Sequence, residues 1–361
     1  MAKTLKLLVF YLLFGSNCYS QNNQSLISKS RFDSAKIQFK NFEQQHRGSI
    51  QTKNIELHYL EWGTPKDTPL IWVHGSFTNA YELMDVADNL VKNGYYVIAI
   101  DYYGHGLTKI PQHEVSLYHV ADDINTLMIS KKIEKAVIGG WSRGGIIATA
   151  FYDTYPDKVL GLILEDGGSV STNTYYHKMK EDELRERVKE IFKDWVTYPK
   201  FDSQFEAYQT FHEGGKGTQF ELLAWLTEDS NGKWSIGTGI TDLFNMSNED
   251  QFINTVLRPT QATLFGESMA IVEPKIVYRN LHVPMLILDP TSDQDIFPYE
   301  NENRQLKNEH SKLITHKLYE NTGHNIHYEK PMKFVKDLSE FLGVVKNHWS
   351  KKIRTTNAKN P

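Results

Sequence analysis

Residues 136–151 read AVIGGWSRGGIIATAF: an apolar run, a glycine-flanked serine and a second apolar run. The first run is typical of a buried strand and the second of a helix, which places Ser142 at a tight strand-to-helix turn. Gly140 and Gly144 fit such a turn, because a side chain at either position would collide with the neighbouring strand or helix. The pattern predicts an exposed, nucleophilic serine. Taken alone, it also fits a glycine-rich turn with an incidental serine.

Strand-like and helical segments alternate along the rest of the chain. Short apolar runs bounded by Gly, Pro or Asp predict strands buried on both faces of a sheet, at residues 55–62, 70–73, 95–100, 136–138, 159–164, 284–288 and 313–319. Helices are expected between them, as at residues 81–92, 120–130 and 144–154. This alternation predicts an α/β fold with a mostly parallel, doubly wound sheet.

The length of 361 residues suits one large domain that carries an insertion. The strand–helix rhythm stops at residues 170–275, a segment rich in charged and aromatic residues. We expect a mainly helical cap there, inserted into a core made of residues 49–169 and 276–345. Residues 21–48 are expected to form a linker or loose helix, and residues 346–361 a basic, frayed tail.

The first twenty residues have the layout of a secretory signal peptide. Lys3 and Lys6 precede an apolar run at residues 7–14, and small or polar residues follow. We therefore expect export to the periplasm or the exterior, with a retained N-terminal anchor as one alternative. A lipid anchor at Cys18 is another, less favoured because no aliphatic residue directly precedes it. Cys18 is the only cysteine, so cleavage after residue 20 would leave a chain without disulfides or thiol ligands.

Composition and motifs exclude several function classes. The net charge is −4, whereas nucleic-acid binding needs a basic surface. After the N-terminus, no apolar run is long enough to span a membrane. No Walker-type or dinucleotide-binding glycine loop occurs, and the acidic residues at 289–295 lack the calcium-loop pattern. The sequence predicts neither a cofactor nor a metal, and it leaves the oligomeric state open.

Two further turns follow predicted strands. His74-Gly75-Ser76-Phe77 comes after the strand at residues 70–73. Loops after parallel strands gather at one edge of the sheet, so this turn is expected to face Ser142. The backbone N–H groups of Ser76 and Arg143 then predict an oxyanion hole, although an ordinary tight turn would look the same. The second turn, residues 101–106, contains His105, for which we expect a supporting role.

A serine nucleophile needs a base, and the base needs an acid that fixes its tautomer. His324 follows the last predicted strand and supplies the base. Acidic residues follow the strand before it, and the chain order Ser, Asp, His is then satisfied. Counting from the start of that strand favours Asp293 as the acid, with Asp295 as the alternate. Asp166, after an earlier strand, is a third option that also fits a structural turn residue.

Together these motifs resemble the α/β-hydrolase superfamily. His74-Gly75 is similar to its oxyanion turn, residues 101–106 to its DxxGHG turn, residues 140–144 to its nucleophile elbow, and Gly323-His324 to its terminal GH. Two departures stand out. Pro290 replaces the glycine that usually precedes the acid, and Arg143 stands where smaller or uncharged residues are common. Arg143 would bind a substrate carboxylate or form a salt bridge within the scaffold.

The resemblance implies acyl transfer on a small-molecule acyl substrate. A serine at position 142, in place of aspartate, argues against the family's epoxide hydrolases and haloalkane dehalogenases. We expect a carboxylic ester hydrolase, then an amidase or proline-iminopeptidase-like enzyme, then a binding protein without catalysis. The substrate-contacting side chains are expected to be aromatic, namely Phe77, Trp141, Tyr175 and Trp195. The alternative is that the cap's aromatic rings form its own core.

Overall fold

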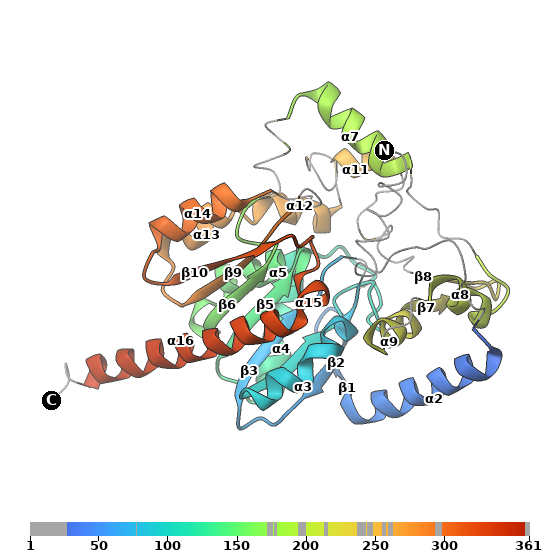
Figure 1. Cartoon of the computed structure of the whole chain (residues 1–361), viewed down its shortest axis with the longest axis horizontal. Helices are drawn as coiled ribbons and strands as arrows, with labels where there is room; N and C mark the ends of the chain where they lie inside the picture. The colour runs from blue at the N-terminus through green and yellow to red at the C-terminus, as the bar shows by residue number, and fades with distance from the viewer. Residues whose placement is uncertain are drawn as a thin grey trace.

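The structure is a computed structural model that describes residues 27–76, 78–171, 176, 179–193, 200–212, 216–236, 243, 248–254, 258, 263–292 and 298–357. An eight-stranded sheet with the order β1-β2-β4-β3-β5-β6-β9-β10 forms its centre (Figure 1). The last six strands in this order are parallel to one another, and β2 pairs antiparallel with both of its neighbours, β1 and β4. The strands are β1 (Arg47–Gln51), β2 (Glu56–Trp62), β3 (Thr68–Val73), β4 (Tyr95–Ile100), β5 (Ala136–Trp141), β6 (Val159–Glu165), β9 (Met285–Thr291) and β10 (Ile314–Glu320). The predicted mostly parallel α/β sheet is confirmed.

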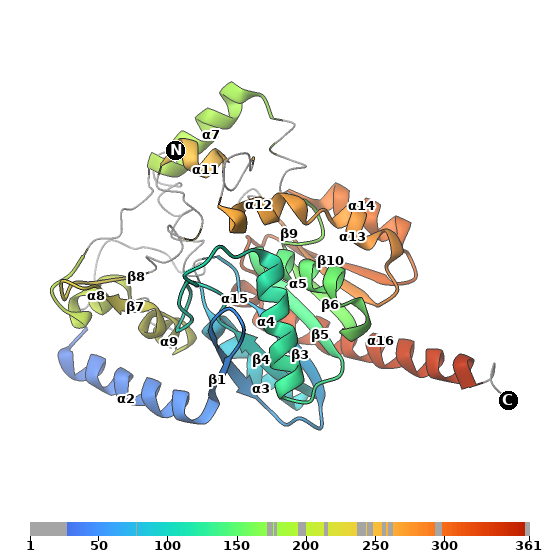
Figure 2. The same ribbon diagram turned by 180° about the vertical axis from the view of Figure 1, so that it is seen from behind.

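Helices cover both faces of the sheet, which explains the continuous apolar runs of the central strands. Alternate residues of β3 point to opposite sides: Ile71 packs in one hydrophobic cluster and Trp72 in the other. The first cluster also contains residues from α4 (Leu117–Ser130), α5 (Arg143–Thr154), α12 (Leu264–Ile271), α13 (Pro274–Val277) and α14 (Glu300–Glu309). The second contains residues from η1 (Ala80–Leu83), α3 (Met84–Lys92) and α16 (Pro331–Asn357). Figure 2 shows α4 and α5 on the face opposite to α3 and α16.

The segment between β6 and β9 contains helices and a two-stranded sheet. Its described elements are α7 (Glu181–Lys193), α8 (Gln204–Phe211), α9 (Lys216–Trp225), β7 (Leu226–Glu228), β8 (Trp234–Ile236), α11 (Glu249–Phe252), α12 and α13. Both ribbon views show α7 beside α11, away from the group of α8, α9, β7 and β8 (Figures 1 and 2). Helices α12 and α13 pack with α4 and α5, so the core packing begins about ten residues before the expected boundary at 275.

Helices flank the core at both ends, where a linker or loose helix and a frayed tail were expected. Residues 29–46 form the regular helix α2 (Lys29–His46), whose Ser28 side chain accepts a hydrogen bond from the Arg31 N–H. At the other end, α16 continues to Asn357 where a frayed tail was expected. The Trp349 indole N–H explains part of this, because it donates to the Leu160 carbonyl at 2.9 Å. The predicted signal peptide lies outside the described residues and stays a prediction.

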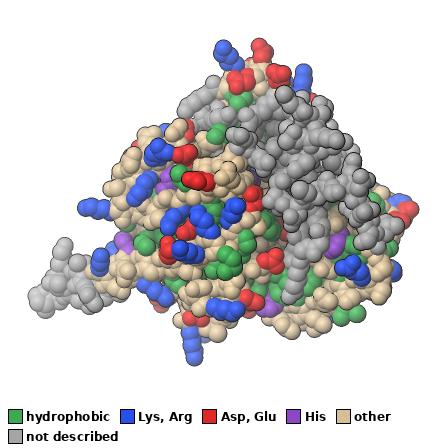
Figure 3. Space-filling model, in the orientation of Figure 1, with side chains coloured by type: hydrophobic (Ala, Val, Ile, Leu, Met, Phe, Trp, Pro, Cys, Tyr) green, Lys and Arg blue, Asp and Glu red, His purple; other side chains and the backbone are tan. Residues whose placement is uncertain are grey.

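Charged side chains of both signs are mixed on the face shown in Figure 3. Among the described residues, no helix combines the length and the hydropathy needed to cross a membrane.

Candidate active site

Ser142 lies at the turn between β5 and α5, as predicted. Its backbone angles are φ 53° and ψ −119°, a conformation that non-glycine residues rarely adopt. The Ser142 N–H donates to the Glu165 carbonyl at 2.8 Å, which holds the turn against the end of β6. Helix α5 begins at the next residue. The turn therefore lifts the serine from the sheet edge while its backbone stays anchored.

The glycines around Ser142 are required by close backbone contacts. A Cβ atom on Gly144 would lie 1.9 Å from the Val73 carbonyl oxygen, and one on Gly140 would lie 2.3 Å from the Gly144 carbonyl carbon. Gly167 is equally restricted, because its Cβ would lie 2.0 Å from the Ser142 carbonyl oxygen. The predicted steric reason for Gly140 and Gly144 is confirmed.

His324 follows β10 and contacts Asp166, the residue directly after β6. The imidazole Nδ1 is hydrogen-bonded to the Asp166 Oδ2, and both side chains are buried. Burial, together with the negative charges of Asp289 and Glu165, raises the pKa of Asp166 well above its usual value. Against this shift, a hydrogen bond donated by the His324 Nδ1–H favours the ionised form of Asp166. In that form Asp166 only accepts, and the His324 Nε2 keeps a lone pair. This arrangement suits a histidine that acts as a base through Nε2.

The favoured acids of the sequence analysis, Asp293 and Asp295, lie outside the described residues. Within the described part, the carboxylate on His324 comes from Asp166, the third option. Asp289 has other partners, because its Oδ2 accepts from the Asn303 amide at 3.0 Å and lies 2.7 Å from the His316 Nε2. The order Ser, Asp, His holds for Asp166 too. Its place at the carboxyl end of a central strand was the signal that could have ranked it higher.

The His74-Gly75 turn is braced by hydrogen bonds. The Tyr102 N–H donates to the His74 Nε2 at 3.3 Å, so the His74 Nδ1–H donates to the Gly75 carbonyl, 2.6 Å away. Burial lowers the pKa of His74 well below its usual value, which keeps the imidazole neutral. Ser76 follows this turn directly. Arg143 is the first residue of α5, where N–H groups have no acceptor within the helix.

Arg143 and His105 pack against the same turn. The Arg143 guanidinium is buried and hydrogen-bonded to the Tyr102 side chain, and burial lowers its pKa without removing its charge. The His105 Nδ1 lies 2.8 Å from the Tyr103 carbonyl oxygen. Burial lowers the pKa of His105 to about 3, so it is neutral. His105 thus has the supporting environment that was expected, and Arg143 contacts the scaffold.

Trp141, the residue directly before Ser142, is buried. Its side chain is 1% exposed, and its indole N–H donates to the His324 carbonyl at 2.7 Å. A Cβ on Gly75 would lie 2.4 Å from its ring. Trp141 thus supports the segment that carries His324, and its predicted substrate contact stays a prediction. The other three predicted contacts, Phe77, Tyr175 and Trp195, lie outside the described residues.

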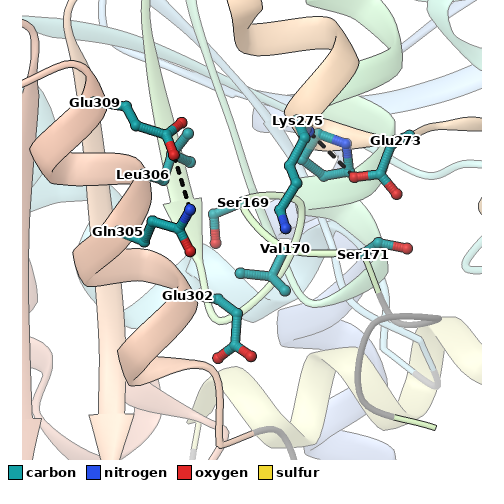
Figure 4. A pocket seen from close by; sticks show the side chains of 10 residues that line it. Ser169, Val170, Ser171, Glu273, Lys275, Glu302, Gln305, Leu306 and Glu309 are labelled. Atoms are coloured by element: carbon teal, nitrogen blue, oxygen red, sulfur yellow. Dashed lines mark hydrogen bonds between the residues drawn. The ribbon is translucent and has the colours of Figure 1, made fainter. Parts of the chain in front are cut away.

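A surface pocket lies near the end of β6 (Figure 4). Its lining includes Ser169, Ser171, Lys275 of α13 and Glu302 of α14. None of the residues Ser142, His324 and Asp166 contributes to its lining. Among the described residues, no group of three or more His, Cys, Asp or Glu side chains is arranged to hold a metal ion.

Comparison with known proteins agrees with this architecture. A segment of 120 residues is 28% identical to epoxide hydrolase 1 of Caenorhabditis elegans, covering 32% of this chain and 28% of that protein. A segment of 112 residues is 29% identical to a bifunctional esterase/perhydrolase of Acinetobacter calcoaceticus, covering 30% of this chain and 40% of that protein. The match thus spans less than half the length of either relative.

Solved structures match over most of both chains. The crystal structure of E-2-(acetamidomethylene)succinate hydrolase superposes with a TM-score of 0.60 and 15% identity, covering 82% of this chain and 100% of that one. Residues 68–331 match the family model described as alpha/beta hydrolase fold. With its eight-stranded sheet and its serine turn, the chain belongs to the α/β-hydrolase fold family.

Proposed function

We propose that this protein is a serine hydrolase that cleaves carboxylic esters through Ser142, His324 and Asp166. The observation that carries the proposal is the buried hydrogen bond between the His324 Nδ1 and Asp166. It combines with a serine held at positive φ on the turn after β5. A carboxylate that orients a histidine, together with a serine on a strained turn, is the arrangement used for acyl transfer on several folds.

In the proposed reaction, the Ser142 Oγ attacks the substrate carbonyl carbon while the His324 Nε2 takes its proton. The N–H groups of Ser76 and Arg143 stabilise the negative oxygen of the tetrahedral intermediate. The carbon–oxygen bond to the alcohol then breaks, and His324 returns its proton to the leaving oxygen. Water repeats the sequence on the acyl-enzyme, which releases the acid and restores Ser142.

An ester is the favoured substrate because an alcohol leaves with little help from the site. An amide needs stronger protonation of its leaving nitrogen, which makes greater demands on the position of His324. The related bifunctional esterase/perhydrolase supports the ester assignment. We expect 4-nitrophenyl acetate to serve as a first test substrate.

Turnover of 4-nitrophenyl acetate by residues 21–361 tests the proposal. Wild-type protein is expected to hydrolyse it, and Ser142→Ala to lower kcat by at least about 10³-fold. A fluorophosphonate probe is expected to add once, on Ser142, as read by intact mass and peptide mapping. A folded wild-type protein that neither reacts with the probe nor hydrolyses any ester, thioester or amide would contradict the proposal.

The identity of the acid is tested by two matched variants. Asp166→Asn is expected to lower kcat about 10³–10⁴-fold, because the asparagine amide can favour the wrong tautomer of His324. Asp293→Asn is expected to leave kcat within about threefold of wild type. The reverse ranking would assign the role to Asp293.

A further inference from the structure

Glu165, the last residue of β6, contacts the segments that carry the proposed catalytic groups. Its backbone oxygen accepts the Ser142 N–H at 2.8 Å, and Asp166 follows it directly in the chain. Its carboxylate accepts the His327 backbone N–H at 2.9 Å. The His327 Nδ1 lies 2.7 Å from one carboxylate oxygen and 2.9 Å from the other. The Glu165 backbone thus holds the serine turn and leads into Asp166, and the Glu165 side chain holds the segment after β10.

His327 lies three residues after His324, on the short helix α15 (Ile326–Glu329). Its ring is buried against Trp141 at a centroid distance of 5.2 Å, and the Trp141 indole N–H holds the His324 carbonyl. Burial lowers the pKa of His327, but the charge of Glu165 and the hydrogen bond to it outweigh this, so the pKa lies above its usual value. The raised pKa favours a protonated His327 beside the buried Glu165 carboxylate, so the two side chains depend strongly on each other.

The same buried cluster reaches the oxyanion turn through Glu82. The Glu82 carboxylate accepts hydrogen bonds from the Gly75 N–H at 3.2 Å and the Thr78 hydroxyl at 2.6 Å. It also interacts electrostatically with His327, which lowers its pKa, and with Glu165, which raises it. Glu82, Glu165 and His327 thus link the backbone segments that the proposed reaction must hold in register.

We propose that Glu165 and His327 form a second carboxylate–imidazole pair that positions the Ser142, His324 and Asp166 segments relative to one another. The inference rests on the proposed function of those three residues. Neither member of the pair acts on the substrate; both are positioning residues. Small displacements of reacting groups cost large factors in rate, so loss of the pair is expected to lower kcat and leave KM nearly unchanged.

The test compares His327→Leu with His327→Asn in the full chain. Leucine removes the partner of Glu165, whereas the asparagine amide can donate from near the position of Nδ1. We expect His327→Leu to lower kcat for 4-nitrophenyl acetate, and the rate of fluorophosphonate labelling of Ser142, about 10²-fold. The KM of His327→Leu is expected to stay within about threefold of wild type. The kcat of His327→Asn is expected to be about tenfold higher than that of His327→Leu.

His316→Leu is the matched control. His316 also pairs with a buried carboxylate, that of Asp289 at 2.7 Å. The charge of Asp289 acts on Asp166, but among the described residues no hydrogen bond joins the His316–Asp289 pair to Ser142, Asp166 or His324. Its loss is expected to lower Tm in a similar way and to leave kcat within about threefold. Equal losses of kcat in His316→Leu and His327→Leu would overturn the inference, because they would reflect destabilisation alone.

The remaining outcomes separate the inference from the proposed function. A folded His327→Leu protein with wild-type kcat would overturn the inference alone. So would a folded His327→Asn protein whose kcat is no higher than that of His327→Leu. Wild-type protein that the probe does not label would overturn both. If His327→Leu does not fold, Glu165→Gln decides, because it keeps an acceptor for the His327 N–H and removes the charge. A tenfold lower kcat is then expected, and an unchanged kcat would contradict the inference.

Discussion

At the residue scale, the buried carboxyl of Glu82 makes stability depend on pH. Burial raises its pKa from 4.5 to about 7, although three donors, including the Trp72 indole N–H at 2.5 Å, hold it. Below pH 4.5 the folded and unfolded states both keep the proton. Between pH 4.5 and about 7 the unfolded chain loses it while the folded protein keeps it, so the free energy of unfolding falls as pH rises. Above that range Glu82 is ionised in both states, and the free energy of unfolding no longer changes with its titration.

Glu82→Gln removes this titration and is expected to change the pH dependence of stability. Relative to wild type, its free energy of unfolding should rise by about 3 kcal/mol between pH 4.5 and 8, at 1.36 kcal/mol per pKa unit. The loss of a hydrogen-bond acceptor lowers the free energy of unfolding of the variant by the same amount at every pH. Urea unfolding at both pH values measures the difference. A difference that does not vary with pH would show that Glu82 titrates at its ordinary pKa.

At the element scale, the turn between β5 and α5 depends on glycine at position 144. Gly144→Ala would place a Cβ 1.9 Å from the Val73 carbonyl, against backbone that cannot move independently. We expect a loss of about 3 kcal/mol or more in the free energy of unfolding. Gly343→Ala is the matched control, because a Cβ there meets nothing within 4 Å and lies on the exposed side of α16. The free energy of unfolding of Gly343→Ala is expected to be about 0.5–1 kcal/mol higher than that of wild type. Equal effects of the two variants would refute the steric argument.

The elements that the sequence predicted well are those with a strong local pattern. Strand β5 is buried at every position, so its apolar run was recognisable without knowledge of its neighbours. Strand β1 was not predicted, because its side chains are partly exposed and its identity depends on pairing with β2. The same reason explains Asp166: its contact with His324 joins residues 158 positions apart and requires β6 to lie beside β9. Local spacing carries no information on such neighbours; it favoured Asp293, which lies outside the described residues and stays a prediction.

At the scale of the whole molecule, α2 joins the N-terminal region to the segment inserted between β6 and β9. Phe32 is 1% exposed, and its ring lies 5.3 Å from that of Phe205 and 5.0 Å from that of Tyr208. Further along the helix, the Phe42 ring lies 5.5 Å from that of Phe220 on α9. No local pattern could reveal these partners, which come from about 170 residues later in the chain. Helix α2 therefore holds α8 and α9 in place.

Phe32→Ala tests this role of α2, with Ile37→Ala on the same helix as its control. Removing the Phe32 ring leaves a cavity among aromatic neighbours and is expected to cost about 3–5 kcal/mol of the free energy of unfolding. Ile37 is 63% exposed, so its truncation should change stability by less than about 0.5 kcal/mol. Limited proteolysis locates the effect: Phe32→Ala should be cleaved faster within residues 204–225, while the sheet strands stay protected. Faster cleavage throughout the chain would mean that α2 stabilises the whole domain and has no particular link to α8 and α9.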